Sequence, residues 1–268
     1  MKIFETEHYI FNYGENSCAE KDIEKIADMQ EKCLECICNT LKTTPSFKIR
    51  YYLCDSPEEV GRAYGDNEPC NGFADIPDKI YAVYNDNVKC IGFHEDAHVV
   101  SYTINRPNSA AIREGLAMYF DRIWWGIPNI VWTKSYIDNG LYLPFDKLLD
   151  EDCFFENDCA LTYPVAGAFT EWLIFAYGIE KYLSLYKQND MPKAFENIYG
   201  KSAQELTRAF EKYVQLFDFD DVLTKRTMDL LKEYAYEAKY STMRTKTHAI
   251  SNNINDKNFC ARLTNYQS

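Results

Sequence analysis

Two histidines and a glutamate stand close together near the centre of the chain, in residues 93–120 (FHEDAHVVSYTINRPNSAAIREGLAMYF). His94 and His98 are four positions apart, so on a helix each can turn a ring nitrogen towards the same metal ion. Glu95 lies beside them and faces the position that such a metal leaves open. Because the chain has only four histidines, this HExxH motif is a specific signal. It predicts one Zn²⁺ per chain, with Glu95 as the catalytic base.

The same residues could instead form a hydrogen-bonded network without a metal. Mostly apolar side chains surround the motif: Ile91, Val99, Val100, Tyr102 and Ile104. The motif is therefore the polar stripe of an otherwise buried helix. Burying two imidazoles and two carboxylates without an ion would cost several kcal/mol, which favours the metal site.

A third ligand is expected from the next segment. Residues 105–108 (NRPN) interrupt the first helix, since proline disfavours helical geometry in the residue before it. A second helix is expected over residues 110–121, and an antiparallel arrangement would bring Glu114 to the histidine face. Gly115 and Ala117 are small enough for the two helices to approach closely. A helical glutamate is usually solvated, but apolar residues surround Glu114, so we expect it to bind zinc.

These residues resemble a known group of enzymes. HExxH followed by EGLAMYF is similar to the gluzincin branch of the zinc metallopeptidases, of which thermolysin is the familiar member, and more closely to the peptidase MA-like families. Residues 162–186 resemble the helix and YG turn that follow in those families, and the likeness covers residues 78–215. It implies a zincin-like α+β fold, zinc held by His94, His98 and Glu114, and hydrolysis with Glu95 as base.

The chain departs from the thermolysin pattern at one position. Thermolysin-like members carry an aspartate four residues after the ligand glutamate, where this chain has Met118. Asp121 is a possible substitute as the partner that orients a zinc-bound histidine. The metzincin branch is excluded, because its motif requires glycine at Ser101 and histidine at Ile104.

Hydrolysis also needs a group that stabilises the oxyanion. The remaining histidines, His8 and His248, stand near the two ends of the chain. Tyr163 matches a tyrosine of the resembling families and is the candidate, although a purely packed tyrosine is the alternative in a chain with 21 of them. Asp96 and Arg113 flank the ligands and could support them from behind, but surface or pairing roles are favoured for both.

Composition limits the class of protein. The chain of 268 residues is 46% hydrophobic and 26% charged, as in globular proteins that bury a sizeable core. Its net charge of −12 argues against nucleic acid or anionic membrane as partners. The start of the chain does not read as a signal peptide, and the longest apolar run, residues 123–132, is too short to span a bilayer. We therefore expect a soluble, cytoplasmic protein, with a peptide or protein as substrate and an oligomeric state that the sequence does not reveal.

The first third of the chain predicts a small mixed sheet. A strand or hairpin is expected in residues 1–16, then a helix of about 24 residues capped near Ser17, then a strand in residues 46–54. Residues 56–79 begin as a short helix and become a loop that can form the rim of a substrate cleft. The strand that follows, at Ile80–Tyr84, corresponds by resemblance to the sheet edge to which a peptide substrate adds as an extra strand.

Three cysteines in the first helix could suggest a second metal site. Cys33, Cys36 and Cys38 follow a helical pattern, however, and core packing is the favoured interpretation. The residues expected on one buried face are Ile23, Ile26, Met29, Cys33, Cys36 and Ile37.

The last third of the chain predicts helices. One is expected to end at Gly178 with Pro164 in its first turn, and others at 179–188, 191–198, 202–217 and about 219–240. We expect one catalytic domain over residues 1–240, made of an N-terminal part (1–75) and a metallopeptidase-like core (78–215). Residues 241–268 are expected to form a polar, extended or poorly ordered tail.

Three functions agree with these patterns. The first is a zinc peptidase that acts on extended polypeptide. The second is a zinc amidase on a small or cell-wall substrate, which a narrow closed pocket with a covered strand edge would favour. The third is a non-catalytic binding module with the same fold. Glu95 argues against the third, because it contributes nothing to holding the metal.

Overall fold

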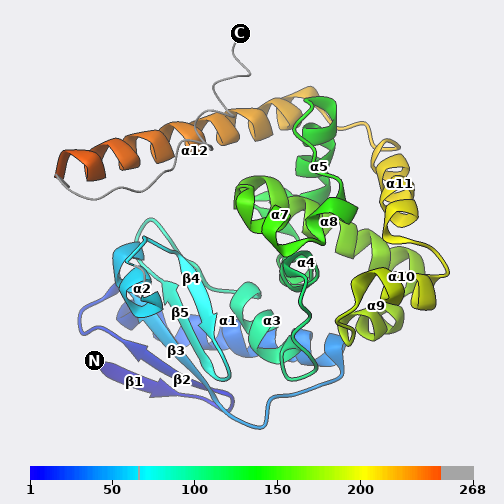
Figure 1. The fold of residues 1–268 in the computed structure, drawn as a ribbon. Helices are drawn as coiled ribbons and strands as arrows, with labels where there is room; N and C mark the ends of the chain where they lie inside the picture. The colour runs from blue at the N-terminus through cyan, green and yellow to red at the C-terminus, as the bar shows by residue number, and fades with distance from the viewer. Residues whose placement is uncertain (66, 249–268) are drawn as a thin grey trace.

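The structure, a computed structural model, describes residues 1–65 and 67–248, and their side chains as far as residue 235. A five-stranded sheet with helices on both faces forms the N-terminal part, and a helical assembly forms the C-terminal part (Figure 1). The strands are β1 (Lys2–Glu5), β2 (Tyr9–Tyr13), β3 (Ile49–Cys54), β4 (Gly72–Asp75), β5 (Lys79–Val83), and a small pair, β6 (Ile123–Trp124) and β7 (Ile127–Pro128). The α+β class is confirmed.

The helices fall into two groups. Those of the N-terminal part and the centre are α1 (Cys18–Leu41), α2 (Pro57–Tyr64), α3 (His94–Ser101) and α4 (Ala110–Asp121). Those of the C-terminal part are α5 (Asn129–Asp138), α6 (Phe145–Leu148), α7 (Glu151–Glu156), α8 (Cys159–Tyr177), α9 (Ile179–Tyr186), α10 (Met191–Tyr199), α11 (Ala203–Val214) and α12 (Asp221–His248).

The sheet is mixed, with the order β1-β2-β3-β5-β4. Strands β2, β3 and β5 are parallel, whereas β1 and β4 are antiparallel to their neighbours. The prediction that Ile80–Tyr84 forms the sheet edge is wrong, because β5 lies between β3 and β4. The edge is β4, inside the stretch expected to be a loop. Its sequence, GFAD, contains Gly72 and Asp75, residue types that are rare in strands.

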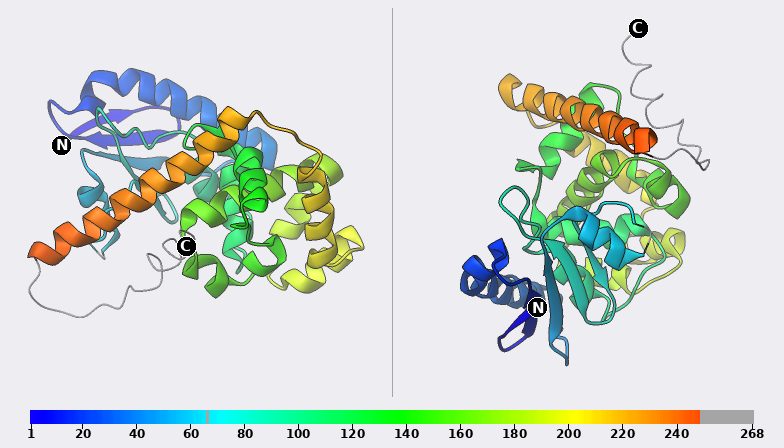
Figure 2. Two further views of the ribbon diagram at one scale, coloured as in Figure 1. Left: turned by 90° about the horizontal axis from the view of Figure 1, so that it is seen from above. Right: turned by 90° about the vertical axis from the view of Figure 1, so that its left-hand side faces the viewer.

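Strand alternation gives the sheet two apolar faces. Tyr51 and Ile80 face the main core, together with α1, whereas Cys54 and Val83 face a smaller cluster that Val60 of α2 completes. The two helices therefore cover opposite faces of the sheet (Figure 2).

Helix α1 begins where the sequence predicts. The Ser17 side chain accepts a hydrogen bond from the Glu20 backbone N–H at 3.1 Å and so caps the helix. Of the residues expected on its buried face, Cys33 is buried, but Met29 and Cys36 are exposed. The apolar stripe is thus narrower than predicted.

The helical part is organised around α4 and α8, which pack closely. A Cβ at Gly115 would lie 2.5 Å from Thr170 Oγ1 and 2.9 Å from the Ala166 carbonyl oxygen of α8. Gly115 therefore allows contact with α8, not with α3 as predicted. Gly167 of α8 is equally tight, since its Cβ would lie 2.7 Å from Met118 Cβ.

Helix α8 starts earlier than predicted, at Cys159, so Pro164 lies inside it. Proline cannot donate the backbone hydrogen bond that the carbonyl of Ala160 would receive. The buried Tyr136 hydroxyl donates to that carbonyl instead, at 2.5 Å. A side chain of α5 thus compensates for the missing bond and ties α5 to α8.

By length and composition alone, α8 could also cross a membrane. Most of it is buried inside the protein, against α4 and α5 among others. That burial is typical of a core helix in a soluble protein, and the cytoplasmic location stays a prediction.

Helix α12 continues to His248, beyond the predicted end at residue 240. Of the predicted tail, residues 241–248 are thus helical rather than extended, and residues 249–268 lie outside the described residues.

Candidate metal centre

The two central helices bring the predicted ligands together. His94 and His98 project from α3, and Glu114 projects from α4, which packs against it. Glu114 Oε2 lies 3.2 Å from His98 Nε2 and 3.4 Å from His94 Nε2. One atom from each of the three side chains can be chosen so that all lie within 4.8 Å of one another. In the described part of the chain, this is the one such group of three.

These separations fit a tetrahedral metal ion. Zinc binds histidine nitrogen and carboxylate oxygen at about 2.0–2.2 Å, so neighbouring ligand atoms in a tetrahedron lie roughly 3.3 Å apart. The two nitrogen–oxygen distances agree with that value. Two imidazoles and a carboxylate also form a donor set that leaves a fourth position free. The group can therefore hold a metal ion, although the geometry does not distinguish zinc from other divalent metals.

The three candidate ligands interact with one another electrostatically. Burial alone would raise the pKa of Glu114, but His98 and His94 outweigh it and hold that pKa well below its ordinary value. Burial alone would lower the pKa of His94, but Asp121 and Glu114 raise it well above the ordinary value. The carboxylate is thus kept ionised, in the form that binds a cation.

Asp121, at the last position of α4, orients His94. Its Oδ2 atom lies 2.8 Å from His94 Nδ1, on the side of the ring away from Glu114. The predicted substitute for the missing aspartate is therefore in contact with a ligand. Met118, at the thermolysin position, is fully buried, and Gly167 of α8 lies against it.

His98 has no comparable partner. Its Nδ1 atom is buried and makes no hydrogen bond with the described residues. Its neighbour Asp96 is fully buried and accepts hydrogen bonds from the Tyr9 hydroxyl and the Gln30 side chain, both at 2.7 Å. A surface position, one of the roles expected for Asp96, is therefore wrong, and its carboxyl group is held by two neutral hydrogen-bond donors. Asp96 anchors α3 to β2 and α1.

Glu95 lies between the metal ligands and the edge strand. A Cβ on Gly72 of β4 would lie 3.3 Å from Glu95 Oε1, so the carboxylate rests against this glycine. Burial raises the pKa of Glu95, and the charges of His94 and His98 oppose that shift. A raised pKa makes a carboxylate a better proton acceptor, as a general base requires.

Tyr163 of α8 lies on the other side of the ligands. Its ring is stacked with that of His94, with centroids 6.1 Å apart and an interplanar angle of 11°. Burial raises the pKa of Tyr163 well above its ordinary value, and the nearby Glu114 carboxylate adds to the shift. The phenol therefore stays protonated and can donate a hydrogen bond beside the ligands.

All five predicted site residues line one open cavity of about 580 Å³. The cavity lies between β4 and the helices that carry the ligands. Aromatic side chains stand on both sides of it, with Tyr64 and Phe73 next to the sheet and the exposed Phe155 on α7. The predicted rim of the cleft, residues 56–79, contributes a large part of this lining.

The open edge of β4 borders this cavity. The backbone N–H of Val83 donates to the Asn71 carbonyl, so the Asn71–Val83 pair at the end of the ladder is hydrogen-bonded. Because hydrogen-bonded pairs alternate in an antiparallel ladder, the backbone groups of Gly72 and Ala74 point away from β5. The Gly72 carbonyl accepts from the Cys70 thiol. Ala74 thus presents both its N–H and its C=O to the open side.

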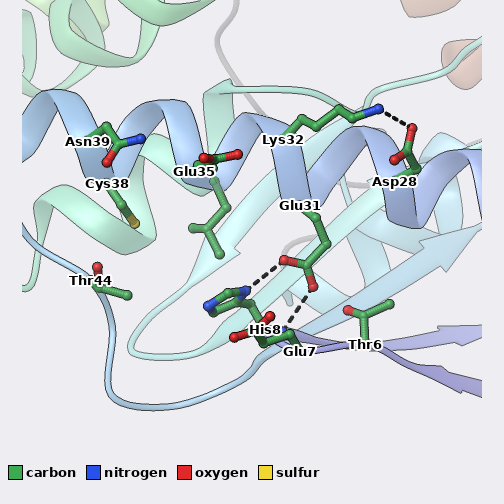
Figure 3. Close-up of a pocket in the computed structure, with 11 residues that line it drawn as sticks. Thr6, Glu7, His8, Asp28, Glu31, Lys32, Glu35, Cys38, Asn39 and Thr44 are labelled. Carbon is green, nitrogen blue, oxygen red and sulfur yellow. Dashed lines mark hydrogen bonds and ion pairs between the residues drawn. The ribbon is translucent and has the colours of Figure 1, made fainter.

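A second cavity of about 570 Å³ lies along α1, and Figure 3 shows it. His8 Nδ1 and Glu31 Oε2 point towards one another there, at 2.7 Å, and Lys32 reaches Asp28. These groups pair among themselves and do not converge as metal ligands. The chemistry of the molecule is therefore centred on α3 and α4.

Comparison with known proteins adds no relative. No protein-family model, no curated protein and no solved structure matches this chain. The resemblance to the gluzincins therefore depends on the motif residues.

Sequence reasoning missed two features of the site. Strand β4 was not predicted, because its sequence lacks β-branched residues. Tyr102 and Arg106 also line the cavity. The position of Tyr102, one turn after His98, was a signal that could have placed its side chain beside the histidines. Arg106 lies in the connection between α3 and α4, where helical spacing gives no signal.

Proposed function

We propose that this protein is a zinc-dependent peptidase that cleaves peptide bonds in extended polypeptide. One observation supports this above all others. Two imidazoles and a carboxylate converge at the distances of a tetrahedral site, with a second acid, Glu95, beside them in a cavity. A zinc ion in such a site supplies a bound water of near-neutral pKa and an electrophile for a carbonyl oxygen.

Three side chains have the remaining roles in the proposed reaction. Glu95 accepts the proton of the attacking water while the new C–O bond forms, and passes it to the leaving nitrogen as the C–N bond breaks. The Tyr163 hydroxyl donates a hydrogen bond to the oxygen on which negative charge develops. Asp121 contacts His94 Nδ1 and would hold the ring so that Nε2 is available to bind the ion.

The edge strand supports a peptide as substrate. An extended chain can add to β4 through the outward N–H and C=O of Ala74, which demand little of the substrate's side chains. Glu95 rests against Gly72, two residues along the same strand, so a peptide bound there would pass the base. A small-molecule amidase would be favoured by a closed pocket and a covered edge. Among the described residues, no strand pairs with the outer side of β4.

A cleavage assay tests the proposal. Wild-type protein and Glu95→Gln, each supplied with zinc, are incubated with a broad peptide library, and products are identified by mass spectrometry. The proposal expects equal zinc in both proteins and new peptide termini in wild type alone. Equal zinc with no cleavage by either protein would instead support the binding module.

A further inference from the structure

The cavity continues past the metal ligands along the C-terminal end of α3. Tyr102 follows His98 by one turn, and their ring centroids are 5.5 Å apart. The Arg106 guanidinium lies over the Tyr102 ring, 5.3 Å from its centroid. Both side chains line the cavity, and so does Arg113, which directly precedes Glu114. Two arginines thus stand on the same side of the candidate centre.

Neither arginine is fully neutralised. None of the ion pairs of the described residues involves Arg106, which is exposed. Arg113 is buried and donates to the Pro107 carbonyl at 2.6 Å and to Glu151 at 2.7 Å. The Glu151 side chain is 47% exposed, so water weakens that pair.

The other charges of the cavity lie elsewhere. Glu114 belongs to the metal ligands, and Glu95 lies against β4. Asp75 of β4 is paired with Lys79 at 2.8 Å. The end of the cavity at Arg106 is therefore cationic, in a chain whose net charge is −12.

We propose that Arg106 and Arg113 form a subsite that binds a carboxylate of the substrate. The inference depends on the proposed function, because it concerns the same cavity. Guanidinium groups bind carboxylates through two parallel hydrogen bonds. Arg106 is exposed, so its guanidinium is accessible to a carboxylate of the substrate. The carboxylate belongs either to an aspartate or glutamate side chain or to the C-terminus of the peptide.

The distances limit where that carboxylate stands in the substrate. The separation of the His98 ring and the Arg106 guanidinium cannot exceed the sum of their distances to the Tyr102 ring, which is the length of roughly three residues of extended chain. The carboxylate is therefore within about three residues of the bond that is cleaved. Because Arg106 lies at one end of the cavity, the preference for a carboxylate should apply to substrate residues on one side of the cleaved bond only.

Binding to zinc-loaded Glu95→Gln tests the subsite without requiring hydrolysis. The probes are acetylated decapeptide libraries, one with a free C-terminal carboxylate and one amidated, and the peptides retained by immobilised protein are identified. If the subsite binds an acidic side chain, the peptides retained from the amidated library should be enriched roughly threefold to tenfold in Asp or Glu. If it binds the C-terminus, free-acid peptides should be retained roughly threefold to tenfold more than amidated peptides. The first result assigns an acidic side chain and the second assigns the C-terminus.

Variants of Arg106 separate a charge effect from a structural one. In the Glu95→Gln background, Arg106→Glu should abolish the preference or reverse it in favour of Lys and Arg, and Arg106→Lys should keep it. Arg122→Glu is the matched control, because Arg122 is also exposed and also lies over a tyrosine ring, at 4.4 Å from the Tyr119 centroid, outside this cavity.

The outcomes separate this inference from the proposed function. Acid-selective binding that Arg106→Glu removes supports the subsite, even if wild type cleaves nothing. Cleavage by wild type with no acidic preference, unchanged by Arg106→Glu, overturns the subsite and leaves the peptidase standing. Equal retention of acidic and amide peptides by the parent and by Arg106→Glu also overturns it.

Discussion

Replacing Asp121 with alanine should weaken zinc binding without removing a ligand. Asp121 Oδ2 lies 2.8 Å from His94 Nδ1, at the length of a charge-assisted hydrogen bond. Without it, the His94 ring loses the acceptor that fixes its orientation and raises its basicity. The three ligand side chains stay in place, so the effect should appear in the affinity rather than in the stoichiometry.

The size of the loss follows from the exposure of the pair. A hydrogen bond to a charged group contributes about 1.5–3 kcal/mol. The His94 and Asp121 side chains are 23% and 26% exposed, so solvent screening places the bond at the lower end of that range. A loss of about 1.5–2 kcal/mol corresponds to a roughly tenfold to thirtyfold increase in the Kd for zinc.

Competition with a chromophoric chelator measures this Kd in wild type and variants. Asp121→Asn keeps an acceptor without the charge and should give a smaller loss than Asp121→Ala. Asp138→Ala is the matched control, since Asp138 also stands at the end of a helix and, among the residues whose side chains are described, forms an ion pair with Lys134 alone. A Kd for Asp121→Ala within twofold of wild type, in a protein that unfolds at the same temperature, would refute the role given to this contact.

Four further predictions concern the site and its support. Ala74→Pro removes the outward N–H of the edge strand, so the KM for peptides should rise about tenfold while zinc binding is unchanged; Ala74→Val, which keeps the N–H, is the control. Tyr163→Phe should lower kcat by a factor of about 10²–10³ with little change in KM, measured by steady-state kinetics. Gly115→Ala places a Cβ 2.5 Å from Thr170 Oγ1 and should lower the free energy of unfolding by about 1–3 kcal/mol in urea titrations. Zinc at a hundredfold excess over its Kd should raise the free energy of unfolding of wild type by about 2.7 kcal/mol, but not that of Glu114→Ala.

The part of the site that could be predicted lies on two consecutive helices. His94 and His98 are one turn apart on α3, and a short connection returns the chain so that Glu114 meets them. Helical periodicity and one predicted helix break were enough to bring the three candidate ligands together, because all three lie within 21 positions of sequence. Asp121 was found for the same reason.

The part that could not be predicted depends on pairing between distant segments. The edge strand β4 is formed by Gly72–Asp75, whose residue types favour turns, and the ladder with β5 overrides that preference. Gly115 was expected to face α3 but faces α8, because the partner of a helix face is decided by tertiary packing. Pro164 was expected in the first turn of its helix, and the Tyr136 hydroxyl allows it to stand deeper.

Metal analysis of the purified protein and its ligand variants tests the central claim most directly. Zinc is measured by mass spectrometry after the protein is loaded and desalted, in wild type, Glu95→Gln, His98→Ala and Glu114→Ala. The account predicts one zinc per chain in the first two proteins and almost none in the other two, with all four folded. Zinc retained in full by both His98→Ala and Glu114→Ala, or absent from folded wild type, would contradict it.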